Sequence, residues 1–419
     1  MDNLQSTVAK LAAMRGHVKQ LMTAAAQFAP EFAPEFAAGG PRETGRVLQE
    51  TADFGRNPGK LRMLHHVPAV LGPAPALVDA LHGCTQTAAS YDEGSGWSTL
   101  AERHGFALLM PEQQSGNNPN LCFNWFEPAH TRRGGGEALS IHQMIKCMIE
   151  THAVDPARVF IVGLSAGGAM TAAMLAAYPD VFAAGAVIAG LPAGAASNLR
   201  EAMDAMRGGP RRAPQDWGDH VRRASPHLGS WPRLSVWHGD SDPIVHPQNT
   251  ENIVEQWCNL HGLSIAPASD AVNSGHRRRV WRDGSGAEAI EAYVLSGMSH
   301  GVPLGLDDPA ERCGRAGPLH FDVGISSAAS IVRFFDIAVE GVRSVDVADT
   351  AAGQPSSAAH GPAATSARPM PADPLDVIAN ALRQAGVIGP GPGSKGPAGA
   401  HDPQQIVAKT LRAVGLLKP

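Results

Sequence analysis

A serine stands between two glycines at the point where an apolar run meets an alanine-rich one. Residues 159–163 are Val-Phe-Ile-Val-Gly, and Ser165 follows between Gly163 and Gly167. The apolar run predicts a buried strand, and the alanines beyond it predict a helix. A Gly-x-Ser-x-Gly segment in this context is typical of a sharp turn that exposes the serine hydroxyl. We therefore predict that Ser165 is a nucleophile. The alternative is a glycine-rich turn with an incidental serine, since the chain has 46 glycines.

A serine nucleophile needs a base, and the base needs a carboxylate to orient it. In α/β-hydrolases the acid follows the serine in the chain and the histidine comes last. His300 lies in a Gly-x-x-His-Gly loop after the predicted strand 290–295, so we predict that it is the base. Asp242 lies in the polar loop after the predicted strand 234–238, and we predict that it is the acid. Asp240, in the same loop, is the alternative acid, or it caps the turn.

Two backbone N–H groups are needed to hold the negatively charged oxygen that such a reaction forms. Ala166 follows the serine directly, so its N–H is the first predicted donor. The second is expected in the loop after an early strand. There Gly83 lets the backbone turn so that the N–H of Cys84 faces the site, and the thiol itself need not act.

Strands alternate with helical patterns across the middle of the chain. This alternation predicts an α/β fold with a mostly parallel sheet and helices on both faces, and ligands are expected beyond the C-terminal ends of the strands. We assign residues 50–340 to this catalytic domain, with 191–232 as a cap over the site. The predicted strands are 61–67, 76–82, 107–111, 159–163, 185–189, 234–238, 279–282 and 290–295.

Both ends of the chain carry helical extensions. Residues 1–49 combine an amphipathic helical pattern with a Phe/Pro-rich arm, and 341–372 is a Ser/Ala/Gly/Pro linker. Residues 373–419 hold a tandem repeat, in which each copy starts with Asp-Pro and ends at a glycine before two apolar residues. The repeat predicts two short helices. We expect them to pack on each other, on the N-terminal helix or on a second copy of the chain, or to bind an apolar surface.

Composition narrows the choice of partners. A net charge of −5 gives no indication of a nucleic-acid partner, and no run approaches the ~20 apolar residues of a membrane helix. The N-terminus lacks a basic segment followed by an apolar one, which argues for the cytoplasm or an unusual export route. The five cysteines include no Cys-x-x-Cys pair, so a zinc or redox site is not expected. A serine nucleophile with a histidine base implies no metal or organic cofactor either. We predict that Cys147, in a helical pattern, is a buried free thiol.

Seven segments of the catalytic region carry a specific resemblance. The chain resembles the poly(3-hydroxybutyrate) depolymerase family of esterases, a group that also includes feruloyl esterases. The resembling segments are LHGCTQ (81–86), PEQ (111–113), NPNLCFNWF (118–126), GLSAGGAM (163–170), HGDSDPIV (238–245), GMSHG (297–301) and CGRAGPLHFDVGISSA (313–328). The resemblance implies an α/β-hydrolase fold and a serine ester hydrolase. The substrates it implies are polyhydroxyalkanoate-type polyesters, their oligomers or short-chain esters. A feruloyl or acetyl esterase and a polymer-granule surface-binding protein are the alternatives.

The resemblance also assigns roles to single residues. It implies Ser165 as nucleophile, Asp242 as acid and His300 as base, with Cys84 and Ala166 as oxyanion donors.

Further implications of the resemblance concern an aromatic residue, the cysteines and the compartment. Trp125 matches an aromatic that lines the substrate groove, with core packing as the alternative. Exported relatives suggest a Cys84–Cys122 bridge and, less directly, Cys258–Cys313. An extracellular location is implied, although no signal peptide is visible.

Overall fold

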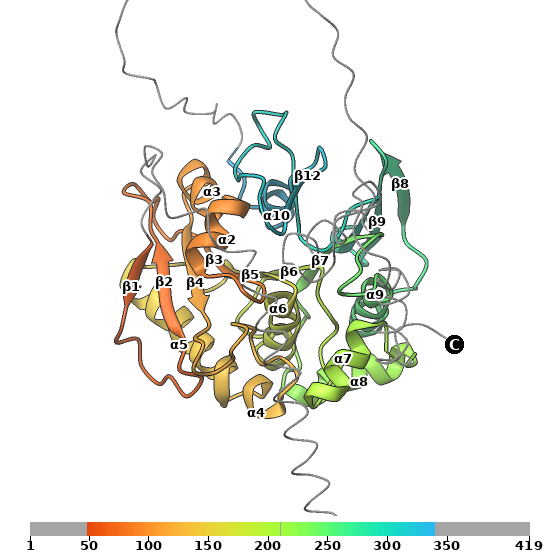
Figure 1. Cartoon of the computed structure of the whole chain (residues 1–419), viewed down its shortest axis with the longest axis horizontal. Helices are drawn as coiled ribbons and strands as arrows, with labels where there is room; N and C mark the ends of the chain where they lie inside the picture. The colour runs from red at the N-terminus through yellow and green to blue at the C-terminus, as the bar shows by residue number, and fades with distance from the viewer. Residues whose placement is uncertain (1–47, 210, 340–419) are drawn as a thin grey trace, which may run out of the picture. The chain divides into compact units, whose positions relative to one another are not determined.

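A ten-stranded sheet runs through the part of the chain that the computed structural model describes, residues 48–209 and 211–339 (Figure 1). In space the strands follow the order β1-β2-β4-β3-β5-β6-β7-β10-β9-β8. Neighbours from β4 to β10 are parallel, and the pairs at both ends of the sheet are antiparallel. The strands are β1 (Gln49–Thr51), β2 (Arg62–His66), β3 (Leu77–Leu81), β4 (Ala107–Glu112), β5 (Val159–Leu164), β6 (Ala184–Ile188), β7 (Arg233–Gly239), β8 (Ser269–Asn273), β9 (His276–Arg282) and β10 (Glu288–Leu295).

Helices cover both faces of this sheet (Figure 1). On one face lie α5 (Gly136–His152), α6 (Ala166–Ala177) and α9 (Gln248–His261), and on the other lie α2 (Ala88–Ser95), α3 (Trp97–His104) and α10 (Ser327–Phe334). Each face has its own apolar cluster, because alternate residues of the central strands point to opposite sides. The remaining elements are α4 (Pro128–Thr131), α7 (Leu199–Met206), α8 (Pro214–Ala224) and the small parallel pair β11 (Val302–Leu304) and β12 (His320–Asp322).

The predicted fold class is confirmed in its central features. All eight predicted strands are present, each within a few residues of its predicted bounds. Four further strands, β1, β8, β11 and β12, were not predicted. They have three to five residues each, and β8 is exposed along its whole length. Such short strands carry little hydrophobic periodicity, so the sequence gives no strong signal for them.

Two of the cysteine predictions need correction. Cys84 and Cys122 form a disulfide, as the resemblance implied, but Cys258 and Cys313 are both free thiols. Cys258 lies in α9 and belongs to the apolar cluster on that face of the sheet. Cys313 packs against the cluster on the opposite face. The sheet therefore separates the two sulfur atoms. Cys147 is a free thiol as predicted, but it is only half-buried.

The predicted terminal elements lie outside the described residues. Residues 1–47 of the predicted amphipathic helix and arm are not described, and neither are the linker 341–372 and the tandem tail 373–419. The homo-oligomer expected from these terminal helices is therefore not tested by the described residues. No helix of the described part has both the length and the apolar character needed to cross a bilayer.

Candidate active site

Ser165 sits at a sharp corner between β5 and α6. Its backbone φ is +56°, a left-handed conformation that is strained for a residue with a side chain. The two flanking glycines are required by close backbone contacts. A Cβ on Gly167 would collide with the carbonyl oxygens of Leu81 and His82, and one on Gly163 would collide with the backbone of Gly167. The corner therefore presses the start of α6 against the end of β3 and presents the serine hydroxyl at the C-terminal edge of the sheet.

Three side chains that are distant in the sequence form a hydrogen-bonded chain at this edge. Ser165 Oγ lies 2.9 Å from Nε2 of His300, and Nδ1 of His300 lies 2.7 Å from Oδ2 of Asp242. Ser165 follows β5, Asp242 follows β7 and His300 follows β10, which is the chain order predicted from the sequence. Because Asp242 accepts the hydrogen bond from the Nδ1–H of His300, the imidazole Nε2 is left free to accept the serine proton. This arrangement can perform nucleophilic catalysis.

Asp242 is surrounded by N–H groups. Oδ1 accepts hydrogen bonds from the backbone N–H groups of Ile244, at 2.8 Å, and Val245, at 2.9 Å. Oδ2 lies 2.7 Å from His300 and 3.1 Å from Nε2 of His238. Burial alone would raise the pKa of this carboxyl group. The hydrogen bonds from His238 and His300 outweigh it and hold the pKa of Asp242 well below its usual value. The carboxylate is therefore negatively charged across the working range of an esterase.

Asp240 has a different place in the same loop. Its Oδ1 accepts a hydrogen bond from the N–H of Gly297, at 2.7 Å, and so joins the loop after β7 to the loop that carries His300. The two loops also touch at Gly239, where a Cβ would collide with the carbonyl oxygen of Met298. Of the two candidate acids, Asp242 contacts His300, and Asp240 caps the neighbouring turn.

The two predicted oxyanion donors lie beside the serine corner. Ala166 is the first residue of α6, and Cys84 lies in the loop after β3, on which the start of α6 packs. Within the described residues neither amide N–H donates a hydrogen bond to another group. Both amides are thus free to bind a ligand oxygen.

Trp125 is half-buried and touches two apolar clusters. One of them contains Ala169, one turn after Ser165, and Val245, three residues after Asp242. Its ring packs edge-on against Phe126, with centroids 5.6 Å apart. Trp125 therefore packs on the core and also lies close to the site, so both interpretations of this residue have support.

One contact of the site was missed by sequence reasoning. His238 stabilises its loop, since its Nε2 donates to the carbonyl oxygen of Val245 at 2.7 Å, and the same atom lies 3.1 Å from Asp242. The available signal was the spacing, because His238 lies near the end of a buried strand and stands four residues before Asp242.

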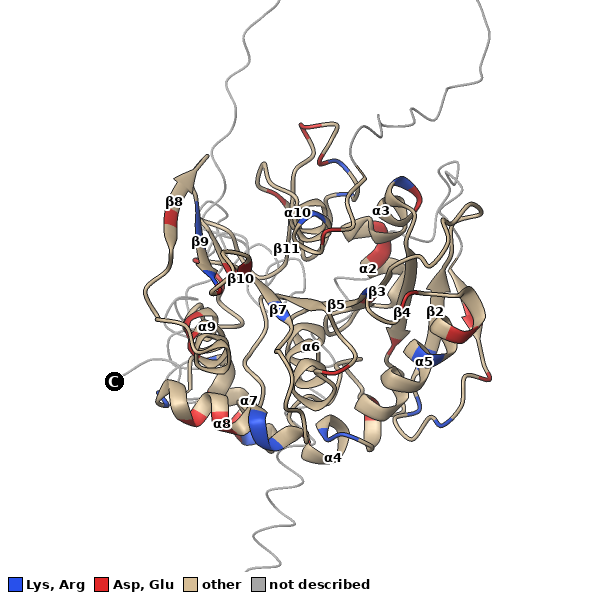
Figure 2. Cartoon of the chain, turned by 180° about the vertical axis from the view of Figure 1, so that it is seen from behind, with Lys and Arg blue, Asp and Glu red and all other residues tan. Residues whose placement is uncertain are grey.

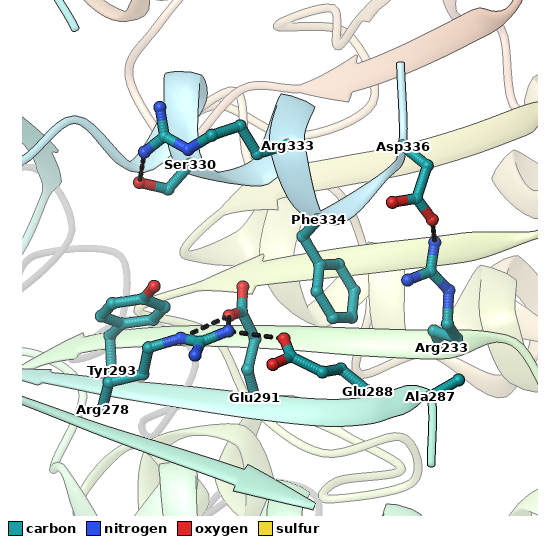
Figure 3. Close-up of a pocket in the computed structure, with 10 residues that line it drawn as sticks. All are labelled: Arg233, Arg278, Ala287, Glu288, Glu291, Tyr293, Ser330, Arg333, Phe334 and Asp336. Atoms are coloured by element: carbon teal, nitrogen blue, oxygen red, sulfur yellow. Dashed lines mark hydrogen bonds and ion pairs between the residues drawn. The ribbon is translucent and has the colours of Figure 1, made fainter. Parts of the chain in front are cut away.

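A separate polar pocket of about 500 Å³ lies between α10 and the sheet (Figure 3). Arg233, which begins β7, lines it, whereas Asp242 follows the other end of that strand. The charges of the pocket neutralise one another, since Arg278 pairs with Glu288 and Glu291 and Arg233 pairs with Asp336. This pocket is therefore distinct from the serine site. No group of three or more His, Cys, Asp or Glu side chains in residues 48–209 and 211–339 is placed to hold a metal ion.

Comparison with known proteins places this site in a family. The family described as esterase PHB depolymerase matches residues 64–282. The chain belongs to this family. Poly(3-hydroxyalkanoate) depolymerase C of Paucimonas lemoignei is 46% identical over 292 residues, which cover 70% of each chain. Feruloyl esterase B of Talaromyces stipitatus is 35% identical over 267 residues, 61% of this chain and 72% of the relative.

Among solved structures, the acetyl xylan esterase from Aspergillus awamori superposes on the family member described here with a TM-score of 0.59. It is 27% identical, and the match covers 70% of this chain and 100% of that one. The relatives and this structure establish an α/β-hydrolase fold and a carboxylic ester hydrolase.

Proposed function

We propose that this esterase works through an acyl-enzyme on Ser165. The observation that supports the proposal most directly is the chain of contacts from Ser165 Oγ to His300, at 2.9 Å, and from His300 to Asp242, at 2.7 Å. Ser165 is largely buried, at 8% exposure.

In the first half of the reaction His300 Nε2 takes the proton of Ser165 as Oγ attacks the ester carbonyl carbon. The carbonyl oxygen becomes negatively charged and accepts hydrogen bonds from the amides of Cys84 and Ala166. The bond from carbon to the alcohol oxygen then breaks, and the alcohol leaves with the proton from His300. In the second half a water gives a proton to His300 and attacks the acyl carbon. The bond from this carbon to Ser165 Oγ then breaks, His300 returns the proton to Oγ, and the acid leaves.

Replacing Ser165 by alanine tests the proposal. We expect Ser165→Ala to lower kcat on p-nitrophenyl butyrate by more than about a thousandfold, because the nucleophile is lost. The melting temperature should stay near that of the wild type or rise, because the change removes only the hydroxyl group and leaves the backbone conformation of residue 165 as it is. A variant with kcat within a few-fold of the wild type would show that another group is the nucleophile.

We propose a water-insoluble aliphatic polyester as the preferred substrate. The name of the depolymerase relative supports this choice, and so does α7, which lies in the segment 191–232 that we propose as a cap. This helix turns Ala202 and Ala205 inward and leaves Leu199 and Met203 about half exposed. Both acidic and basic residues occur on α7 and α8 (Figure 2). Since neither sign of charge dominates there, the exposed pair Leu199 and Met203 is the distinctive feature of α7.

The apolar pair is connected to the loop of the proposed acid. Met206, one turn beyond Met203 on α7, packs against the apolar cluster that contains Val245, and its carbonyl oxygen accepts a hydrogen bond from the backbone N–H of His246 at 2.7 Å. An aliphatic polyester presents methyl and methylene groups that match Leu199 and Met203. A sugar chain bearing feruloyl or acetyl groups, as in the alternative function, is mostly hydroxylated and does not.

The substrate is tested with a solid and a soluble ester. We expect Leu199→Ser with Met203→Ser to lower the rate on a poly(3-hydroxybutyrate) film severalfold and to leave p-nitrophenyl butyrate turnover unchanged. The matched control is Leu228→Ser, because Leu228 is fully exposed and precedes β7, at the end of the strand opposite Asp242. Faster turnover of methyl ferulate or acetylated xylan than of the film would favour the alternative function.

An extracellular location is part of the proposal. The Cys84–Cys122 disulfide supports it, because such bonds persist in oxidising compartments. Thiol titration of the denatured protein, isolated without reductant, should find three free thiols and not five. We also propose residues 50–340 as the catalytic domain, with 341–372 as linker and 373–419 as a separate tail.

A further inference from the structure

A buried carboxylate, Glu137, holds both ends of the segment 113–124. Glu137 lies in the first turn of α5 and is completely buried. Its Oε1 accepts hydrogen bonds from the side-chain amides of Gln113, at 2.8 Å, and Asn124, at 2.6 Å. Its Oε2 accepts the backbone N–H of Asn124, at 2.8 Å. One side chain thus fixes the start and the end of a segment of twelve residues that has little regular structure of its own.

The same segment is attached to the loop that carries the proposed oxyanion donor. Cys122 forms the disulfide with Cys84. The neighbouring residue Thr85 donates its N–H to the carbonyl oxygen of Asn120, at 2.7 Å. Thr85 adopts a left-handed φ of +64°, which needs support from outside the loop. Displacement of the segment would therefore move the Cys84 amide.

A third attachment runs through His82. The backbone N–H of Gln113 donates to Nε2 of His82 at 3.1 Å, and Nδ1 of His82 donates to the carbonyl oxygen of Gly83 at 2.7 Å. Burial lowers the pKa of His82, which keeps it in the neutral form that can accept at one nitrogen and donate at the other. His82 thereby connects the carbonyl group of Gly83 to the backbone of Gln113, and the side chain of Gln113 donates to Glu137.

We propose that Glu137 is a positioning residue for the reaction. It acts through the segment 113–124 on the Cys84 amide, and it also fixes Asn124, which directly precedes Trp125. The inference rests on the proposed function and extends it to a residue that touches neither ester nor serine. The carboxylate is chemically suited to this place because three N–H donors converge on it and a carboxylate only accepts. His130 also lies beside the carboxylate, with its Nδ1 3.3 Å from Oε1, and the interaction with Glu137 raises the pKa of His130.

Glu137→Gln tests the proposal, because it keeps the shape and turns one acceptor into a donor that faces other donors. Glu291→Gln is the matched control. Glu291 is also buried, at 2% exposure, and accepts from Ser235 and Arg278, but it lies at the pocket of Figure 3, away from the serine. We expect both variants to lower the melting temperature. Only Glu137→Gln should lower kcat on p-nitrophenyl butyrate, by about tenfold or more, since losing one oxyanion donor costs roughly 10²–10³ in kcat.

A second variant separates positioning from general loss of packing. In Glu137→Gln combined with Asn124→Asp, the new amide of residue 137 can donate to the new carboxylate of residue 124. We expect the double variant to recover kcat at least severalfold over Glu137→Gln alone. The proposal is overturned if Glu137→Gln keeps its kcat, if Glu291→Gln loses as much, or if the double variant recovers nothing. An active Ser165→Ala protein would instead overturn the proposed function itself, so the two failures are distinguishable.

Discussion

Asp242 and Asp79 are both buried aspartates at strands of the same sheet, but their surroundings differ. Asp242 follows the end of β7, where two backbone N–H groups and two histidines surround its carboxylate. Asp79 lies in the middle of β3, is completely buried, and points to the same side as Leu77 and Leu81 in the apolar core. Among the described residues, neither oxygen of Asp79 has a hydrogen-bond partner.

The two pKa values move in opposite directions for this reason. Burial raises the pKa of Asp79 well above its usual value, so the folded protein holds this group in its neutral form. Around Asp242 the same effect is overcome by the donors, and the pKa falls. A loop leaves backbone N–H groups free to bind a side chain, whereas those in the middle of a strand are used by the neighbouring strands. Buried charge is therefore tolerated at Asp242, beyond the strand end, and not at Asp79, in the strand centre.

The largest effect is expected from Asp242→Asn. This change removes the charge and reverses the proton preference at Nδ1 of His300, so we expect kcat on p-nitrophenyl butyrate to fall by about 10⁴. Asp79→Asn, which makes the same chemical change in the core, should leave kcat within about twofold, because Asp79 is outside the hydrogen-bonded chain.

Asp240→Asn is the control for loop structure. Asp240 lies two residues away and holds the loop of His300 through Gly297, without contacting the imidazole. Its loss should cost less activity than the loss of Asp242. If Asp240→Asn proves the more damaging of the two, then the assignment of Asp242 as the acid is wrong.

The central fold and the three side chains of the hydrogen-bonded chain could be predicted from sequence because their signals are local. Mostly apolar runs identify β3 to β7, and each of the three residues follows a strand within a short, recognisable segment. The contact between Asp242 and His300 joins residues 58 positions apart, so the sequence does not show directly which aspartate of the loop reaches the histidine. Asp242 was preferred because it lies farther out on the loop than Asp240, which directly follows Gly239, and the family resemblance made the same choice.

Other features depend on which face of the sheet a side chain occupies. The Cys258–Cys313 bridge was wrong because nothing in the cysteine spacing reveals that the sheet lies between them. The isolation of Asp79 was not recognised either, since a single polar residue in an apolar strand does not show whether it has a partner. Glu137 reads as an ordinary acidic residue in a first helical turn, and only the folded loop brings its three donors together.

An intermediate effect, on stability, is expected from Asp79→Val. Removing a buried polar group that has no partner should raise the free energy of unfolding by about 1–3 kcal/mol, with kcat unchanged. The gain should depend on pH. The ordinary carboxyl pKa of about 3.9 applies to the unfolded chain. As pH rises above it, the unfolded wild type ionises while the folded Asp79 stays neutral, so the wild type loses stability.

Thermal unfolding of wild type and Asp79→Val at pH 4 and pH 7 checks this prediction. The difference in melting temperature should be larger at pH 7. An equal or smaller difference at pH 7 would mean that Asp79 has a partner that stabilises its charge, and the contrast with Asp242 would then fail.

The smallest effect is expected from removing one donor of Asp242, which makes its surroundings one step closer to those of Asp79. His238→Leu takes away the Nε2 hydrogen, which the carbonyl oxygen of Val245 at 2.7 Å and Asp242 at 3.1 Å share. We expect kcat to fall by about tenfold or less, since a shared hydrogen bond contributes less than the roughly 1.5–3 kcal/mol of a full hydrogen bond to a charged group. His238→Gln places an amide N–H near the same position and should retain most of the activity. Equal losses of kcat in the two variants would point to packing at His238. A loss confined to His238→Leu means that the hydrogen bond from His238 contributes to catalysis, and that donors of this kind distinguish Asp242 from Asp79, which has none among the described residues.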